Sequence, residues 1–172
     1  MPYIAYQIST GIIFPTGTRM SSENLRVGIF VATMTGLADI CGEEIESSLA
    51  AAGVECERRL MDGLDVSAFD EFTLLIIVSS TYGHGEIPDN GQALFASVEH
   101  GADLSGKDYT VFALGDRTYS DTFCAAGESW DAALGACGAR RIVELERHDA
   151  SSGTLAEDVA GAWAAGWASL IA

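Results

Sequence analysis

Three short segments combine hydroxyl, glycine and tyrosine residues, and each directly follows an apolar run. They are residues 33–38 (TMTGLA), 80–85 (STYGHG) and 114–119 (LGDRTY). They come after the apolar runs RVGIFVA, LLIIV and YTVFA, respectively. The carboxyl ends of parallel strands meet at one edge of a sheet, and open α/β sheets bind their ligands there. Hydroxyls and backbone amides hold phosphates, and tyrosine rings stack on flat ring systems. The segments together predict a site for a flat, phosphorylated ligand.

Residues 33–38 are the candidate phosphate loop. A helix that begins here presents unpaired N–H groups and a partial positive charge to an anion. Thr33 and Thr35 add hydroxyls, and Gly36 lets the backbone close around the anion. The loop has no Lys or Arg, which favours one monophosphate, and both G-x-x-x-x-G-K-[ST] and G-x-G-x-x-G are absent. NTP hydrolysis and ordinary Rossmann NAD binding are therefore disfavoured, although this loop alone would equally suit a plain strand-to-helix turn.

The other two segments add the flat faces. Tyr82 is followed by Gly83 and Gly85, which permit backbone conformations that other residues resist, and Tyr119 lies in the third segment. Either tyrosine alone would suit a half-buried packing role. Both together, on adjacent loops beside a phosphate loop, can stack on one ring system. We therefore predict a flavin-nucleotide site.

The same residues carry a resemblance to a known family. The ordered segments TMTGLAD, SSTYGHGEIPDN and LGDRTYSDTFCAAG resemble those of flavodoxins, over about residues 26–171. The similarity extends to short-chain MioC-type flavodoxins and to the FMN domains of diflavin reductases and of the sulfite reductase flavoprotein. It implies bound FMN and a non-catalytic carrier that shuttles single electrons between a flavin reductase and an unknown acceptor. No metal is expected, because His84, His100 and His148 are scattered and form no ligand cluster.

The resemblance also assigns roles to individual residues. Residues 33–38 would hold the FMN phosphate, and Tyr82 and Tyr119 would flank the isoalloxazine ring. In the family, the peptide at the position of Gly83 turns its carbonyl toward flavin N5 on reduction, and Asp149 is a looser candidate for the ribityl chain or ring edge. The complete cofactor-binding set is Thr33, Met34, Thr35, Gly36, Leu37, Ala38, Ser80, Thr81, Tyr82, Gly83, Gly85, Leu114, Gly115, Asp116, Tyr119, Phe123 and Cys124.

Two positions depart from the family pattern. Leu37 stands where a polar residue is usual, and the missing side-chain donor would cost about 1 kcal/mol. The stretch from Tyr119 to Phe123 has one residue more than many relatives, which would change the stacking angle of the Tyr119 ring.

Strand and helix patterns alternate from residue 26 onward. RVGIFVA, FTLLIIV and YTVFAL are nearly continuous apolar runs, typical of central strands, whereas VECERRL and a continuous RIVELER strand alternate and suit the sheet edges. Helices are expected over about 36–52, with Ile40, Ile45 and Leu49 on the apolar face, from about residue 89, over 123–137 and over 154–170. We predict an α/β fold, a flavodoxin-like doubly wound five-stranded parallel sheet of order 2-1-3-4-5 with helices on both faces.

A chain of 172 residues suits one domain. We expect residues 1–24 to be a non-core leader, with Met20 a plausible alternative start, and residues 25–172 to form the FMN-binding domain. Neither a secretory signal nor an apolar run of roughly 20 residues is present, so a cytoplasmic protein outside the membrane is expected. Four cysteines lack C-x-x-C or metal-ligand spacing and suit free thiols: Cys41, Cys56, Cys124 and Cys137.

The chain is strongly acidic, with 25 Asp and Glu against nine Lys and Arg and a formal net charge of −16. Nucleic acid and anionic membranes are therefore disfavoured as partners. The charge either serves solubility of a monomer or steers encounter with a basic-faced redox partner. Four carboxylates near the loops should lower the second reduction potential of a bound flavin: Glu86, Asp89, Asp116 and Asp121.

Other functions fit the pattern less well. The main alternative is an FMN-dependent NAD(P)H oxidoreductase acting on quinones or other small acceptors. A scaffold that binds no flavin also stays open, because of Leu37. A phosphoryl-accepting receiver is excluded, since Ala32–Thr33 and Ser79–Ser80 stand where that chemistry needs carboxylates.

Overall fold

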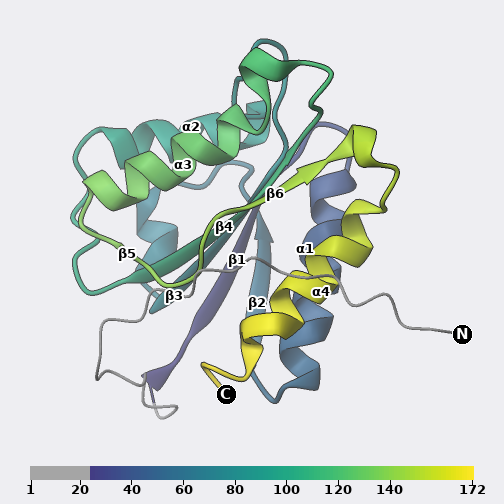
Figure 1. The fold of residues 1–172 in the computed structure, drawn as a ribbon. Helices are drawn as coiled ribbons and strands as arrows, with labels where there is room; N and C mark the ends of the chain where they lie inside the picture. The colour runs from purple at the N-terminus through teal and green to yellow at the C-terminus, as the bar shows by residue number, and fades with distance from the viewer. Residues whose placement is uncertain (1–23) are drawn as a thin grey trace, which may run out of the picture.

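The computed structural model describes residues 24–172, so the expected leader and the alternative start at Met20 lie outside the described residues, Asn24 excepted. Strands and helices alternate along the described chain (Figure 1). No helix between residues 24 and 172 is long and apolar enough to cross a membrane. The strands are β1 (Val27–Ala32), β2 (Cys56–Leu60), β3 (Leu74–Ser79), β4 (Asp108–Gly115), β5 (Arg140–Arg141) and β6 (Glu146–Asp149). The α-helices are α1 (Leu37–Ala51), α2 (Asp89–Glu99), α3 (Ala125–Ala136) and α4 (Ala156–Ala168), and 3-10 turns occupy Val66–Phe69, Ser120–Thr122 and Ala150–Ser152.

The strands form one parallel sheet of order β2-β1-β3-β4, with β5 and β6 both paired to the outer edge of β4. Every residue of β1 and β3 is buried, as are seven of the eight in β4, whereas β2 is partly exposed along its length. This confirms the predicted doubly wound topology and the assignment of continuous apolar runs to the centre of the sheet.

The fifth strand differs from the prediction of one continuous RIVELER strand. It is split into β5 and β6, with residues 142–145 between them. Ile142 and Val143 both pack into the core beneath α1 and α4, while Leu145 packs into the core on the opposite face. Adjacent residues of a regular strand point to opposite faces, so burying both on one face requires a break. The Thr110 hydroxyl on β4 crosses the break and donates to the Val143 carbonyl at 3.2 Å.

Two helices cover each face of the sheet: α1 and α4 lie on one side, and α2 and α3 on the other (Figure 1). On the first face, Trp163 packs against Phe112 with ring centroids 5.5 Å apart. On the second, Trp130 packs edge-on against Phe95 at 4.9 Å. The two cores pack both faces of the central strands, and so fix the positions at which the loops begin.

The apolar face of α1 is rotated from the predicted one. Cys41, Ile45 and Leu49 are fully buried against the sheet and α4, but Ile40 is 47% exposed. Successive helix residues are turned by roughly 100°, so Ile40 lies outside the stripe that its neighbour Cys41 belongs to. Ile40 was therefore wrongly placed in the core.

Candidate functional site

Three loops meet at the carboxyl edge of the sheet, because β1, β3 and β4 are adjacent and parallel. The first runs from Thr33 into α1, the second from Ser80 to α2, and the third from Asp116 to α3. The Ser80 amide donates to the Ala32 carbonyl at 3.0 Å, which joins the starts of the first two loops. The second and third loops also touch, since a Cβ on Gly85 would lie 3.2 Å from the Ala125 methyl. The topology thus brings the three predicted segments together.

The first loop is folded onto itself around Gly36. Gly36 has φ of +91°, in the left-handed region that favours glycine, and it caps the start of α1. Its amide donates to the Thr33 hydroxyl oxygen at 2.9 Å, and its carbonyl accepts from the amides of Asp39 and Ile40 at 3.1 Å. The Thr33 hydroxyl acts here as an acceptor, and its hydrogen stays available to a ligand.

Four amides of the first loop find no hydrogen-bond partner among residues 24–172: those of Met34, Thr35, Leu37 and Ala38. Unpaired amides at the start of a helix, with the partial positive charge of the helix end, are what a phosphate group requires. The loop therefore fits the phosphate of a mononucleotide. Leu37, 37% exposed, adds no side-chain donor, as the sequence indicated.

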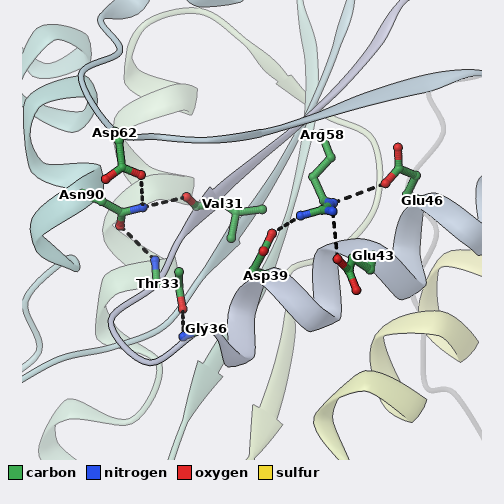
Figure 2. Close-up of polar contacts among 9 residues, drawn as sticks. All are labelled: Val31, Thr33, Gly36, Asp39, Glu43, Glu46, Arg58, Asp62 and Asn90. Atoms are coloured by element: carbon green, nitrogen blue, oxygen red, sulfur yellow. Dashed lines mark hydrogen bonds and ion pairs between the residues drawn. The ribbon is translucent and has the colours of Figure 1, made fainter.

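Arg58, the cation near the first loop, is already paired with carboxylates. Arg58 of β2 pairs with three carboxylates of α1, as Figure 2 shows. It contacts Asp39 directly, Glu43 at 3.0 Å and Glu46 at 3.3 Å. The surrounding carboxylates outnumber its single positive charge. The first loop itself offers an anion only neutral donors, because residues 33–38 include no Lys or Arg.

The second loop is a tight turn centred on Gly83. The backbones of Tyr82 and Glu86 exchange hydrogen bonds at 2.8 and 2.9 Å. The Glu86 carboxylate accepts from the His84 amide and lies over Gly83, where a Cβ would clash with it. With φ of +55°, Gly83 occupies a backbone conformation that suits glycine. The Glu86 carboxylate therefore holds the peptide group that joins Gly83 and His84, through the His84 N–H.

A polar atom at the start of the second loop supports a bound ligand. The Thr81 hydroxyl oxygen is buried, yet no described residue gives it a hydrogen bond. An unsatisfied buried hydroxyl costs about 1–3 kcal/mol and is rare in native structures. A ligand with polar groups along this edge would satisfy it, and the residues present fit FMN on that ground.

The third loop presents an exposed tyrosine ring and has a cation–π contact within itself. Tyr119 is 68% exposed and Tyr82 on the second loop is 51% exposed, so both rings are accessible to a planar ligand. The Arg117 guanidinium lies 4.7 Å from the Phe123 ring centroid. Residues Ser120–Thr122 of this loop form a 3-10 turn directly after Tyr119.

Three of the predicted site residues bury their side chains in the core. Ala38 and Leu114 belong to the core on the α1–α4 face of the sheet, and Cys124 to the core on the α2–α3 face. The Cys124 thiol contacts the carbonyls of Ala113 and His148 at 3.6 and 3.7 Å, and burial raises its pKa to about 12. These residues can reach a ligand only through their backbone groups.

Asp149 and Asn90 have roles that the sequence did not indicate. The Asp149 carboxylate, a loose candidate for ligand contact, is bonded to Arg117 and Ser151. Asn90 binds the phosphate loop and was not predicted as a site residue. Asn90 is the last residue of the segment SSTYGHGEIPDN and lies in the first turn of α2. A polar residue at that position is the sequence feature that could have indicated its role.

The three loops at the carboxyl edge of a 2-1-3-4-5 parallel sheet define a flavodoxin-like nucleotide-binding protein. The chain belongs to the flavodoxin family, whose family model matches residues 29–163. It is 35% identical to Flavodoxin YqcA of Pectobacterium carotovorum subsp. carotovorum over 85% of this chain and 97% of that protein. It is 33% identical to the sulfite reductase [NADPH] flavoprotein alpha-component of Shewanella sp. (strain MR-7), over 80% of this chain but 22% of that longer protein. Among solved structures, a cysteine-to-alanine mutant of flavodoxin from Pseudomonas aeruginosa superposes with a TM-score of 0.77 at 29% identity, over 86% of this chain and 99% of that one.

Family membership confirms the resemblance and the cofactor that it implied. Flavodoxins are FMN-binding electron-transfer proteins that work with redox partners. When bound, FMN supplies a ring system that accepts and releases electrons. The protein part of a flavodoxin binds and orients this ring system and sets its electrostatic surroundings.

Proposed function

We propose that this protein is a one-electron carrier between a flavin reductase and an acceptor. The observation that carries the proposal is the convergence of four unpaired amides in the phosphate loop with two exposed tyrosines on the neighbouring loops. The arrangement suits a mononucleotide whose rings lie at the protein surface, which is where an electron can pass to a second protein.

In this proposal the Thr33 hydroxyl and four backbone amides bind the FMN phosphate, those of Met34, Thr35, Leu37 and Ala38. Tyr82 and Tyr119 cover the two faces of the ring, and the Thr81 hydroxyl donates to or accepts from its polar edge. Backbone groups of residues 114–116 and of Cys124 complete the site, together with the remaining predicted residues of the second and third loops.

The electron donor and acceptor are proposed to approach with basic surfaces. The net charge of −16, with Asp89, Asp116 and Asp121 around the loops, attracts positively charged partners and repels anionic ones. We place the protein in the cytoplasm as a monomer. Sedimentation velocity at several protein concentrations tests the monomeric state. If the protein dimerises, its average sedimentation coefficient should rise with concentration.

The deciding experiment is an anaerobic titration of the FMN-loaded protein followed by absorbance. A carrier should retain flavin after removal of excess FMN and pass through a stable spectrum of flavin holding one electron. Direct passage to fully reduced flavin would favour a two-electron reductase. Failure to retain FMN would contradict the proposal.

Direct consumption of NADPH separates the carrier from the oxidoreductase that the sequence left open. The purified FMN protein should not oxidise NADPH by itself, and should be reduced once a separate flavin reductase is added. Steady NADPH oxidation with a quinone present and no reductase would support the oxidoreductase instead.

A further inference from the structure

Asn90 joins three segments at the carboxyl edge of the sheet through its side-chain amide (Figure 2). Its Oδ1 accepts from the Thr33 amide at 2.9 Å, at the first residue of the phosphate loop. Its Nδ2 donates to the Val31 carbonyl at 3.3 Å and to the Asp62 carboxylate at 3.2 Å. Since a carbonyl and a carboxylate only accept and an amide N–H only donates, this orientation alone satisfies all three partners.

The close approach of α2 to β1 makes this contact possible. Gly91, next to Asn90, is buried against Ala32, and a Cβ there would lie 2.8 Å from the Ala32 methyl and 2.9 Å from Ile87. Any larger residue would push the first turn of α2 outward. Gly91 therefore sets the distance at which the short Asn90 side chain can reach the Thr33 amide.

The contact determines how the phosphate loop begins. With the Thr33 amide held by Asn90, the Thr33 hydroxyl is placed to accept from the Gly36 amide at 2.9 Å. The two hydrogen bonds in series fix both ends of the turn that carries the unpaired amides of Met34 and Thr35. Order present before binding does not have to be created when the ligand binds, so it increases affinity.

We propose that Asn90 is a positioning residue for the phosphate end of the FMN site: its amide preforms the loop at residues 33–36. The proposal rests on the proposed FMN function. Asn90 touches no phosphate in this scheme, and it acts through the Thr33 amide. Its effect is therefore confined to the phosphate and does not extend to the flavin rings.

The first test compares FMN with riboflavin, which carries the same rings without the phosphate. Asn90→Ala is expected to raise the Kd for FMN about tenfold, as for loss of one ordering hydrogen bond, and to leave the Kd for riboflavin within about twofold. Ala favours the helix more than Asn does, so the first turn of α2 is retained. Ser97→Ala is the matched control, because Ser97 lies on α2 and, among residues 24–172, its hydroxyl bonds only the Leu94 carbonyl of the same helix.

The second test does not involve flavin. Hydrogen exchange of the Thr33 and Gly36 amides is followed by NMR in the flavin-free full chain. Both should exchange at least about tenfold faster in Asn90→Ala than in the wild type and Ser97→Ala. Asn90→Asp keeps an acceptor for the Thr33 amide, but its second carboxylate oxygen would face the Val31 carbonyl and the Asp62 carboxylate. The repulsion should leave the Thr33 amide less protected than in the wild type.

Several outcomes would overturn the proposal: equal losses of FMN and riboflavin affinity, no loss of either, or unchanged exchange of the Thr33 amide in Asn90→Ala. If the wild type binds neither flavin, the proposed function fails, but the exchange comparison still decides whether Asn90 anchors the loop.

Discussion

The Asp149 carboxylate at the end of β6 accepts a hydrogen bond from the Arg117 backbone amide at 3.0 Å. The Arg117 side chain approaches the second carboxylate oxygen at 3.5 Å. The same carboxylate accepts from the amide and hydroxyl of Ser151. These hydrogen bonds, with Arg117 contributing first, lower the pKa of Asp149. The end of the split fifth strand thus anchors the third ligand loop.

Asp149→Ala should loosen the third loop and weaken FMN binding several-fold, because the Arg117 amide loses its acceptor. Asp149→Asn keeps one oxygen acceptor and should fall between the alanine variant and the wild type. Fluorescence quenching of FMN gives both Kd values. An alanine variant that binds FMN as tightly as the wild type would show that the loop is held without Asp149.

Gly36→Ala tests the left-handed residue of the phosphate loop. A methyl group there meets no atom within 4 Å, so the cost is backbone strain alone, on the order of 1 kcal/mol. Gly53 at the other end of α1 is a matched control, with φ of +83° and equally open surroundings. Both alanine variants should lose similar stability in urea. Only Gly36→Ala should weaken FMN binding, by about tenfold, and an equal effect of Gly53→Ala would contradict this.

Tyr119→Leu should weaken FMN binding by up to about tenfold, since aromatic stacking contributes roughly 0.5–1.5 kcal/mol beyond its buried area. Tyr119→Phe keeps the ring and should bind FMN nearly as the wild type does. Because Tyr119 is 68% exposed, the melting temperature of the flavin-free protein should not change. Unaltered affinity in the leucine variant would remove Tyr119 from the stacking position.

Asp116→Asn combined with Asp121→Asn should raise the second reduction potential of bound FMN by on the order of tens of mV. Negative charge near the ring opposes addition of the second electron, and removing it relieves that repulsion. The asparagine at 116 keeps an acceptor for the Thr118 amide, now bonded at 2.8 Å. Glu55→Gln, at an exposed site just before β2, is the control. Equal potentials in the wild type and the double variant would refute the expectation.

The buried His148 should make the free energy of unfolding decrease as the pH is lowered through a defined range. Its side chain is 4% exposed, and burial lowers its pKa from the usual value of 6.5, against the opposing effects of Asp149 and Glu157. The unfolded chain therefore binds a proton more readily, so the contribution is complete above about pH 6.5 and is lost as pH falls below it.

Urea denaturation at pH 7, 6 and 5 checks this directly. His148→Gln should show a shallower loss of stability between pH 7 and 5 than the wild type, and Ser97→Ala, which changes no titratable group, should keep the wild-type slope. The same slope in all three proteins would assign the pH dependence to other groups.

The sequence determined the sheet order and the location of the site. Continuous apolar runs can be buried on both faces and alternating ones cannot, which is sufficient to place β1, β3 and β4 at the centre. Parallel strands end at one edge, so the segments that follow those runs had to meet there. Residues 33–38 could be predicted as a phosphate loop because the expected chemistry is local: in the proposed site they would act mainly through their own backbone.

Only the tertiary structure decided which side chains hold those loops in place. Asn90 reaches Thr33 across 57 positions of sequence, and Asp149 reaches Arg117 across 32. Neither pairing leaves a periodic signal, because each depends on how closely α2 or β6 packs against its neighbour. The split of the fifth strand and the exposure of Ile40 follow from the same cause. Local patterns specify which residues can be buried, while the packing of distant elements specifies which of them are.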